Sequence, residues 1–153
     1  MKIIYYMTRA VPALAVGIGA LGVANAVTLK SLKDSQLTDL YGIYAPGGDC
    51  KREPRIKVDD SGLAYEYAGH STHSTSIEYA LTYGGPDYAG ISRWIFPFPV
   101  SDDDVGRVLM IFNPEEKPGT LTAEPNLGLG EHMSEFQAAL VKASPYAKCA
   151  KTP

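Results

Sequence analysis

The sequence feature that most limits the fold of this chain is a series of short runs in which polar and apolar residues alternate. In residues 76–83, Ile77 and Tyr79 fall on one side of an extended chain, and Glu78 and Ala80 fall on the other. A period of two is that of a β-strand with one buried face and one face in water. We therefore interpret these runs as strands of an antiparallel sheet.

Glycine, proline and aspartate separate the runs at short intervals, as in chains that form successive hairpins. The sequence Asp60-Ser61-Gly62, which lies between two alternating runs, gives the clearest hairpin signal. Residues 108–112 are apolar at every position, which predicts a central strand covered on both sides. The predicted strands comprise residues 40–44, 55–59, 63–67, 76–83, 91–98, 108–112 and 120–124.

Two segments depart from this pattern. Residues 27–40 are a mixed polar lead-in, for which we expect one or two helical turns at most. Residues 131–143 place apolar residues such as Met133 and Phe136 at spacings of three and four, which predicts an amphipathic helix. Pro145 ends this helix, because the residue before a proline avoids the helical conformation.

These elements predict a mainly β fold, an antiparallel meander of about six to seven strands that forms a small barrel or sandwich, with one C-terminal helix. A parallel α/β arrangement is disfavoured, since the helices that must connect parallel strands are missing from the pattern. Trp94, Phe96 and Phe98 share one side of their run, and we interpret them as core residues rather than as a contact surface. The tyrosines of the other runs suit half-buried sheet faces.

The first 26 residues have the pattern of a secretory signal peptide. Lys2 and Arg9 precede an uncharged run, residues 11–24, and the segment closes on Ala24 and Ala26 in an A-x-A arrangement. The run is shorter than the roughly 20 apolar residues that a membrane-spanning helix needs. We therefore predict cleavage after Ala26, a single domain over residues 27–153, a periplasmic or extracellular location, and no membrane attachment after cleavage.

The processed chain is acidic. The whole chain has a formal net charge of −3, and the leader contains Lys2 and Arg9 but no acidic residue, so the processed chain has a net charge of about −5. This balance argues against nucleic acid and anionic membranes as partners, because both require a basic face. It is the charge that suits a basic protein partner.

The two cysteines, Cys50 and Cys149, predict one disulfide bond, because an exported chain folds in an oxidising compartment. Closing a loop of about 100 residues removes on the order of 4.7 kcal/mol of denatured-state entropy in the chain-entropy model. The bond would tie the C-terminal tail to the front of the domain. Two isolated cysteines lack the C-x-x-C spacing typical of metal or redox sites.

Two acidic segments are the candidate partner-binding residues. Asp102, Asp103 and Asp104 are consecutive, and Glu115 and Glu116 form a second acidic loop. Calcium loops separate their carboxylates so that several side chains converge on the ion, so three aspartates in a row favour a solvated acidic turn. A concentrated negative loop also speeds encounter with a basic partner and discourages acidic competitors.

The histidines give little support for catalysis. His70 and His73 are three residues apart, so on a strand they would face opposite sides. A zinc site requires three or four ligands, and no such cluster lies nearby in the sequence. Ser71 and Ser74 lie beside these histidines without the G-x-S-x-G context of a nucleophile. We therefore predict no metal and no cofactor, and the sequence favours a protein that is not an enzyme.

Three hypotheses of function follow. The first is an exported, non-enzymatic binding protein, specifically an inhibitor or immunity-type protein for a basic cell-wall hydrolase. The alternative is a small-ligand carrier with a tyrosine-lined barrel or cleft. The third is an enzyme that uses His70 or His73, and it requires a cleft at that segment together with a perturbed ionisable neighbour.

Overall fold

The computed structural model describes residues 26–29, 31–33, 35, 37–74, 76–80, 88–97, 108–130 and 132–150. Within these residues the chain is mainly β, as predicted, with ten strands, one α-helix and two short 3₁₀ turns. The strands are β1 (Ala26–Leu29), β2 (Gly42–Pro46), β3 (Arg55–Asp59), β4 (Gly62–Tyr67), β5 (His70–His73), β6 (Ile77–Ala80), β7 (Arg93–Phe96), β8 (Val108–Phe112), β9 (Thr120–Pro125) and β10 (Tyr146–Lys148). The helical elements are η1 (Thr38–Leu40), η2 (Pro114–Glu116) and α1 (Glu135–Lys142).

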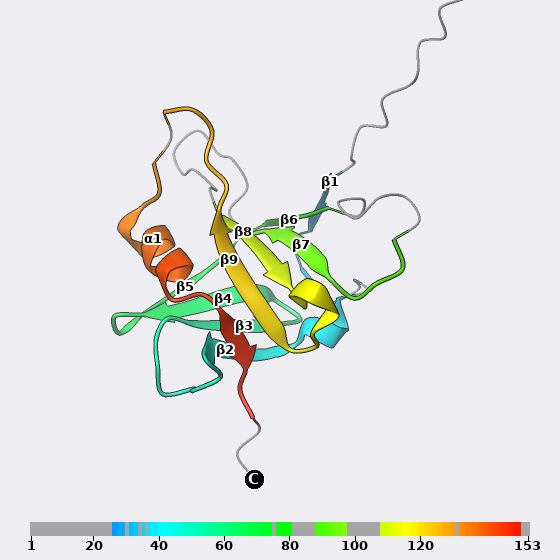
Figure 1. Cartoon of the computed structure of the whole chain (residues 1–153), viewed down its shortest axis with the longest axis horizontal. Helices are drawn as coiled ribbons and strands as arrows, with labels where there is room; N and C mark the ends of the chain where they lie inside the picture. Colours follow the sequence, from blue (N-terminus) through cyan, green and yellow to red (C-terminus); the bar gives the residue numbers. More distant parts are fainter. Residues whose placement is uncertain are drawn as a thin grey trace, which may run out of the picture.

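The ten strands form one sheet in the order β1-β6-β7-β8-β9-β10-β2-β3-β4-β5. Every neighbouring pair is antiparallel. The sheet curls into a half-barrel, so that the half containing β2, β3 and β4 faces the half containing β7, β8 and β9 (Figure 1). β1 and β5 lie at the two ends of the order and do not pair with each other.

Two tight hairpins build the half of the sheet that ends at β5. The β3–β4 turn pairs Asp59 with Gly62 across two residues, as the turn chemistry predicts. The β4–β5 turn has Ala68 at φ 52° and Gly69 at φ 74°. Positive φ at both central residues is the type I′ geometry that matches the twist of a hairpin.

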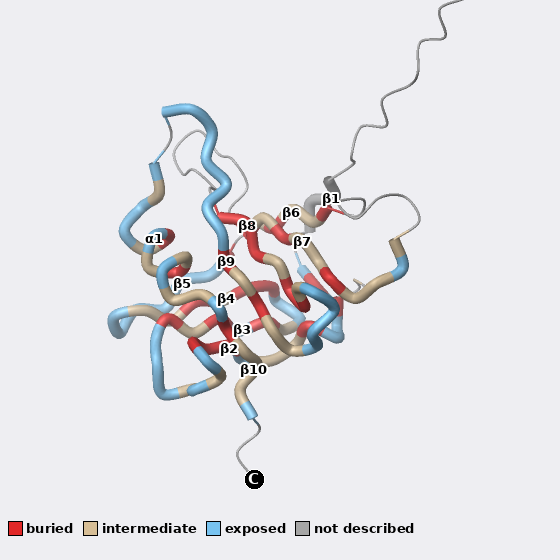
Figure 2. Tube along the Cα trace, viewed as in Figure 1, coloured by how far each residue is buried: buried red, intermediate tan, exposed pale blue. Residues whose placement is uncertain are grey.

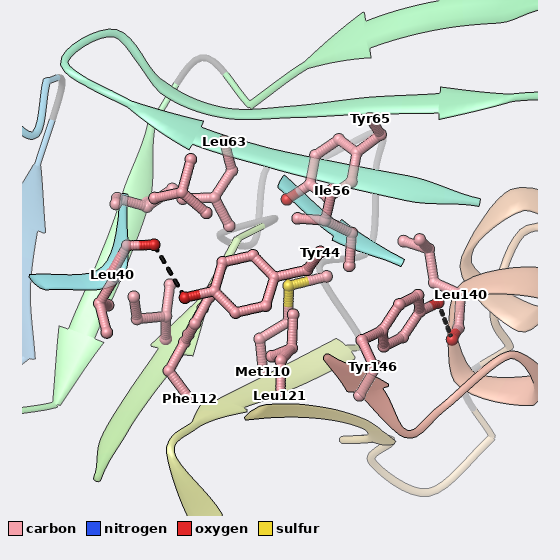
Figure 3. Close-up of a cluster of buried hydrophobic side chains, with 14 of the residues drawn as sticks. Leu40, Tyr44, Ile56, Leu63, Tyr65, Met110, Phe112, Leu121, Leu140 and Tyr146 are labelled. Carbon is pink, nitrogen blue, oxygen red and sulfur yellow. Dashed lines mark hydrogen bonds between the residues drawn. The ribbon is translucent and has the colours of Figure 1, made fainter. Parts of the chain in front are cut away.

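The core lies between the two facing halves and is filled by aliphatic and aromatic side chains (Figure 3). Tyr44 of β2 and Phe112 of β8 meet across it in an edge-to-face contact, with ring centroids 5.3 Å apart. Buried residues follow the inner face of both halves, while most residues of the loops and turns are exposed (Figure 2). The fully buried large side chains are Tyr44, Tyr65, Tyr146, Phe112, Leu32, Leu37, Leu40, Ile56, Leu63, Ile95, Met110 and Leu121.

Two buried tyrosines pack in this core with their hydroxyls satisfied. The Tyr44 hydroxyl donates to the Leu40 carbonyl oxygen at 2.8 Å, and the Tyr146 hydroxyl donates to the Leu140 carbonyl oxygen at 2.6 Å (Figure 3). Burial raises the pKa of both phenols, and the charge of Asp39 raises that of Tyr44 further. These tyrosines are structural, which agrees with the packing role predicted from the sequence.

The predicted disulfide is confirmed. Cys50 and Cys149 are bonded, with Cα atoms 5.8 Å apart and a sequence separation of 99. Cys149 directly follows β10, the strand that pairs with both β9 and β2 and so joins the two halves of the sheet. The bond therefore fastens the chain at this seam.

The predicted count of six to seven strands is too low. The seven predicted runs correspond to β2, β3, β4, β6, β7, β8 and β9, and the chain adds β1, β5 and β10. The added strands have three or four residues each, and none lies in a longer alternating run like the one that contains the four-residue strand β6. The predicted lead-in of residues 27–40 contains β1 and the 3₁₀ turn η1, and the helix α1 begins at Glu135, later than predicted.

The face assigned to β7 is also corrected. Ile95 is fully buried and pairs with Met110, which is fully buried as well, so these residues face the core. Trp94 and Phe96 lie on the opposite face and are half-buried. Phe98 lies outside the described residues. This run has aromatic residues on one side and the apolar Ile91 and Ile95 on the other. Alternation therefore could not identify which side faces the core.

The predicted signal peptide lies outside the described residues except for Ala26, the first residue of β1. No helix in the described ranges has the length and apolarity needed to cross a lipid bilayer.

Candidate functional site

A groove of about 570 Å³ lies between the inner face of the β4–β5 hairpin and the first turn of α1. Figure 1 shows α1, in orange, beside this green hairpin at one end of the sheet. We call it the aromatic groove, and it is lined by Tyr65, Tyr67, Ala68, His70, Thr72, Ser134, Glu135 and Phe136.

The register of the hairpin explains which side chains line the groove. Tyr65 pairs with Thr72, and Tyr67 pairs with His70. Directly paired residues of an antiparallel sheet share a face, and residues two apart on a strand do so as well. All four side chains therefore point toward α1, while the residues between them point to the opposite side.

The start of α1 is fixed by a capping box at Ser134. The Ser134 hydroxyl accepts a hydrogen bond from the Gln137 amide at 3.2 Å, and the Gln137 side chain accepts one from the Ser134 amide at 3.0 Å. This reciprocal pair satisfies two backbone donors and sets where the helix begins. The Phe136 ring then contacts the rings of Tyr65 and Tyr67, with centroids 5.6 and 6.0 Å away. The groove wall is thus made of three aromatic rings from two elements.

The rim of the groove is polar. His70 and Glu135 are both exposed, and Glu135 has no ion pair or side-chain hydrogen bond within the described part of the chain. The Tyr65 hydroxyl is already hydrogen-bonded to the Ser74 hydroxyl at 3.1 Å. Burial raises the pKa of Tyr65, and its bond to Ser74 offsets only part of that rise. This phenol is a structural group and not a proton acceptor.

The structure separates the two histidines that the sequence singled out. His70 lies on the groove side of β5, whereas His73 faces the other side and approaches Gly62. This agrees with the expectation for residues three apart on a strand. Among the described residues, no three histidine, cysteine or carboxylate side chains come together in a way that would hold a metal ion.

The predicted acidic residues have different surroundings. Asp102, Asp103 and Asp104 lie outside the described residues. Glu115 is exposed and pairs with its neighbour Lys117, which lowers the pKa of the Glu115 carboxyl.

Glu116 is held by a network within the protein. Its carboxylate accepts hydrogen bonds from the Tyr88 hydroxyl, from the Ile91 amide at 2.7 Å and from the Ser92 hydroxyl at 3.3 Å. These bonds, the one from Tyr88 first, lower the pKa of Glu116. Ser92 also donates to the Asn113 carbonyl oxygen at 2.6 Å. We call these five residues the loop network, because they join the segment before β7 to the β8–β9 loop.

A second groove, of about 760 Å³, lies between the β8–β9 loop and β10. Its cation, Lys148, donates to the Asp39 carbonyl oxygen at 3.2 Å and lies over the Tyr44 ring, 5.7 Å from the centroid. The cationic group is thus already engaged within the protein. The aromatic groove, with an uncommitted carboxylate and seven of its eight lining residues exposed or half-buried, is the better candidate for ligand binding.

Sequence reasoning did not find the aromatic groove. The Ala68-Gly69 turn lacks the asparagine or aspartate that normally marks a type I′ hairpin, and His70-Ser71-Thr72-His73 has no strand-forming pattern. The capping signal at Ser134 with Gln137 was available and would have placed the helix start correctly.

No protein-family model matches this chain, and comparison with curated proteins and with solved structures likewise finds no match.

Proposed function

We propose that this chain is an exported, non-enzymatic binding protein whose aromatic groove receives a segment of a basic partner, such as a cell-wall hydrolase. The observation that carries the proposal is the groove itself, in which three aromatic rings lie beside an exposed carboxylate at the open end of the sheet. Aromatic residues are enriched at protein interfaces. The groove volume also falls within the roughly 300–1,000 Å³ of most ligand sites.

Export is supported by two features. The N-terminal segment has the organisation of a signal peptide that is cleaved after Ala26. Cys50 and Cys149 form a disulfide, a bond that persists in oxidising compartments such as the periplasm or the extracellular space.

A basic partner is supported by charge. The processed chain has a net charge of about −5, and Glu135 presents its carboxylate at the groove without a competing cation in the described lining. Opposite charges speed encounter and disfavour acidic competitors. The acidic residues singled out in the sequence, Asp102, Asp103, Asp104 and Glu115, are the alternative contact residues for the same partner.

A second candidate is a small-ligand carrier, and one observation favours it. The groove wall includes Tyr65 and Tyr67, as a tyrosine-lined cleft requires; Tyr65 belongs to the core, and Tyr67 is half-buried. The space between the two halves of the sheet is occupied by Tyr44, Phe112 and Met110, so a carrier would use the groove rather than the interior.

The proposal is tested by measuring the affinity of the processed protein for a basic muramidase at 50 and 150 mM NaCl. Thr72→Arg puts a bulky cation into the groove, and Ser71→Arg puts the same side chain on the other face of the same exposed strand. We expect Thr72→Arg to weaken binding at least tenfold and Ser71→Arg to change it by less than twofold.

Equal effects of Thr72→Arg and Ser71→Arg would exclude the groove as the contact site. The contact would be assigned to the acidic loop instead if neutralising Asp102, Asp103 and Asp104 abolished binding while the Thr72→Arg variant bound with unchanged affinity. No binding at either salt concentration would reject a muramidase partner. The carrier function would be established in its place if the protein bound 1-naphthol saturably, lost this binding in the Thr72→Arg variant, and did not bind the muramidase.

A further inference from the structure

The strand that borders the aromatic groove, β5, is an edge strand. It pairs with β4 and with no other described strand, and all four of its residues are exposed (Figure 2). An exposed edge is a site where an extended peptide can add a further strand through main-chain hydrogen bonds. Strand addition requires backbone amides and carbonyls of β5 that are not paired with β4.

The hydrogen bonds between β4 and β5 determine which backbone groups of β5 point outward. The Ser74 amide donates to the Leu63 carbonyl oxygen at 2.9 Å, so these two residues form a hydrogen-bonded pair. Hydrogen-bonded and non-hydrogen-bonded pairs alternate along an antiparallel ladder. The next pair, Ala64 with His73, is therefore non-hydrogen-bonded, and the amide and carbonyl of His73 point away from β4.

The same alternation extends along β5. His70 and Thr72 direct their backbone groups to β4, and Ser71 directs its amide and carbonyl outward as His73 does. The free edge thus offers two donors and two acceptors. The side chains of His70 and Thr72 point into the groove, so the edge and the groove form one continuous surface.

We infer that β5 binds an extended peptide as an added antiparallel strand and that the groove receives a lysine or arginine side chain of that peptide. The inference rests on the site named in the proposed function and identifies what that site recognises. A peptide residue opposite Thr72 would share its face and so enter the groove. There it meets the rings of Tyr67 and Phe136, which are 6.0 Å apart, beside the Glu135 carboxylate.

Aromatic rings attract a cation through their electron-rich faces, and a carboxylate adds an ion pair. The described groove lining contains one carboxylate and neither lysine nor arginine, so a cationic side chain has no competitor there. β5 is also short and polar, which limits unselective edge-to-edge association. The groove then supplies the selectivity for a cationic segment, and the main-chain hydrogen bonds between β5 and the peptide supply the affinity.

The test uses a blocked heptapeptide that alternates threonine and valine around one central lysine, added to the processed protein. Binding is measured by ¹⁵N-resolved amide shifts and calorimetry. We expect shifts at Ser71, His73 and the first turn of α1. Replacing the lysine by norleucine should weaken binding about fivefold, the scale of an exposed cation–π contact with a surface ion pair.

Two matched pairs locate the contacts. N-methylation of the residues flanking the lysine removes the amides that would donate to Ser71 and His73, and should weaken binding at least tenfold. The backbone amide of the lysine itself faces solvent, so N-methylation of that residue should change binding by less than twofold. Glu135→Gln should remove the preference for lysine over norleucine, whereas Glu115→Gln, on the β8–β9 loop, should retain it.

Equal effects of the two N-methylations would overturn strand addition, and equal affinity of the lysine and norleucine peptides would overturn cation recognition. No shifts at 1 mM peptide would overturn both. Peptide binding without muramidase binding would uphold this inference and reject only the partner in the proposed function. Muramidase binding that Thr72→Arg abolishes, without peptide binding, would uphold the groove and reject strand addition.

Discussion

Two regions of this protein present glutamates at the surface, and they use them in opposite ways. On the β8–β9 loop, Glu116 accepts hydrogen bonds from Tyr88, Ile91 and Ser92 and so fastens two loops together. On the rim of the aromatic groove, Glu135 has no such partner among the described residues. Surface charge therefore separates into a carboxylate that holds the fold and one that is available to a ligand.

The two regions also differ in how far hydrogen bonds within the protein hold their backbone. The β8–β9 loop holds Asn113, Glu115 and Glu116 at φ between 52° and 59°, a region that side chains rarely adopt. The Asn113 side chain donates to the Ile91 carbonyl oxygen at 3.1 Å and accepts from the Gly119 amide at 2.9 Å. The loop is therefore held in place by several hydrogen bonds. In contrast, β5 at the groove has amides and carbonyls, those of Ser71 and His73, that point away from β4.

The largest expected effect comes from removing the disulfide, which acts on both regions. Replacing Cys50 and Cys149 by serine should lower the free energy of unfolding by about 2–5 kcal/mol, because the denatured chain regains the freedom of a long loop. Urea unfolding of the oxidised parent and of the double variant measures this. The bond lies at the β10 seam, so hydrogen exchange should increase in the loop network and around the groove together. Faster exchange in only one region would show that the seam does not couple them.

A smaller effect is expected from Gly90→Ala, which acts on the loop network alone. A Cβ at Gly90 would collide with the Tyr88 hydroxyl and the Glu116 carboxylate, so the hydrogen bond between them must break or shift. Both atoms are the far ends of side chains that can move aside, so the expected cost is that of the lost hydrogen bond, roughly 0.5–1.5 kcal/mol. Urea unfolding measures the loss, and the neighbouring Ala89→Ser, at an exposed position, is the control. Peptide binding at the groove should stay within twofold. A concerted loss of stability and binding would contradict the separation of the two regions.

The fold could be predicted where strands are long enough to show their period. The hairpin of β3 and β4 and the central strand β8 follow directly from alternation, turn residues and an apolar run. β5 and β10 have four and three residues and depend on pairing with β4, β9 and β2. Such strands form because they pair with neighbouring strands, and a local sequence pattern contains no information about that pairing.

The site was less predictable for the same reason. The acidic pattern identified Glu115 and Glu116 by charge, but the partners of Glu116 precede it by 24 to 28 residues. The aromatic groove joins Tyr67 to Phe136, which are 69 residues apart in the sequence. Charge and composition are local properties of a sequence, whereas engagement of a carboxylate and the shape of a groove are set by tertiary contacts.

The smallest expected effect separates the two glutamates by their response to acid. The hydrogen bonds of Glu116 lower its pKa in the folded state, so the unfolded chain binds the proton more readily as the pH falls. The stabilisation is thus complete above the unfolded pKa of about 4.3 and is lost as the pH falls through the folded value. Glu116→Gln should flatten the decline in melting temperature between about pH 5 and pH 3.

Glu135→Gln removes a carboxylate that has no ion pair or side-chain hydrogen bond among the described residues, so its melting temperatures should follow those of the parent protein. Some acid sensitivity should remain in Glu116→Gln, since Lys57 and Ser61 lower the pKa of Asp59 to about 2. Melting curves of the three proteins across this pH range provide the measurement. If Glu135→Gln flattened the acid decline as much as Glu116→Gln, both carboxylates would be engaged in the folded state. The groove would then lack the uncommitted charge on which cation recognition depends.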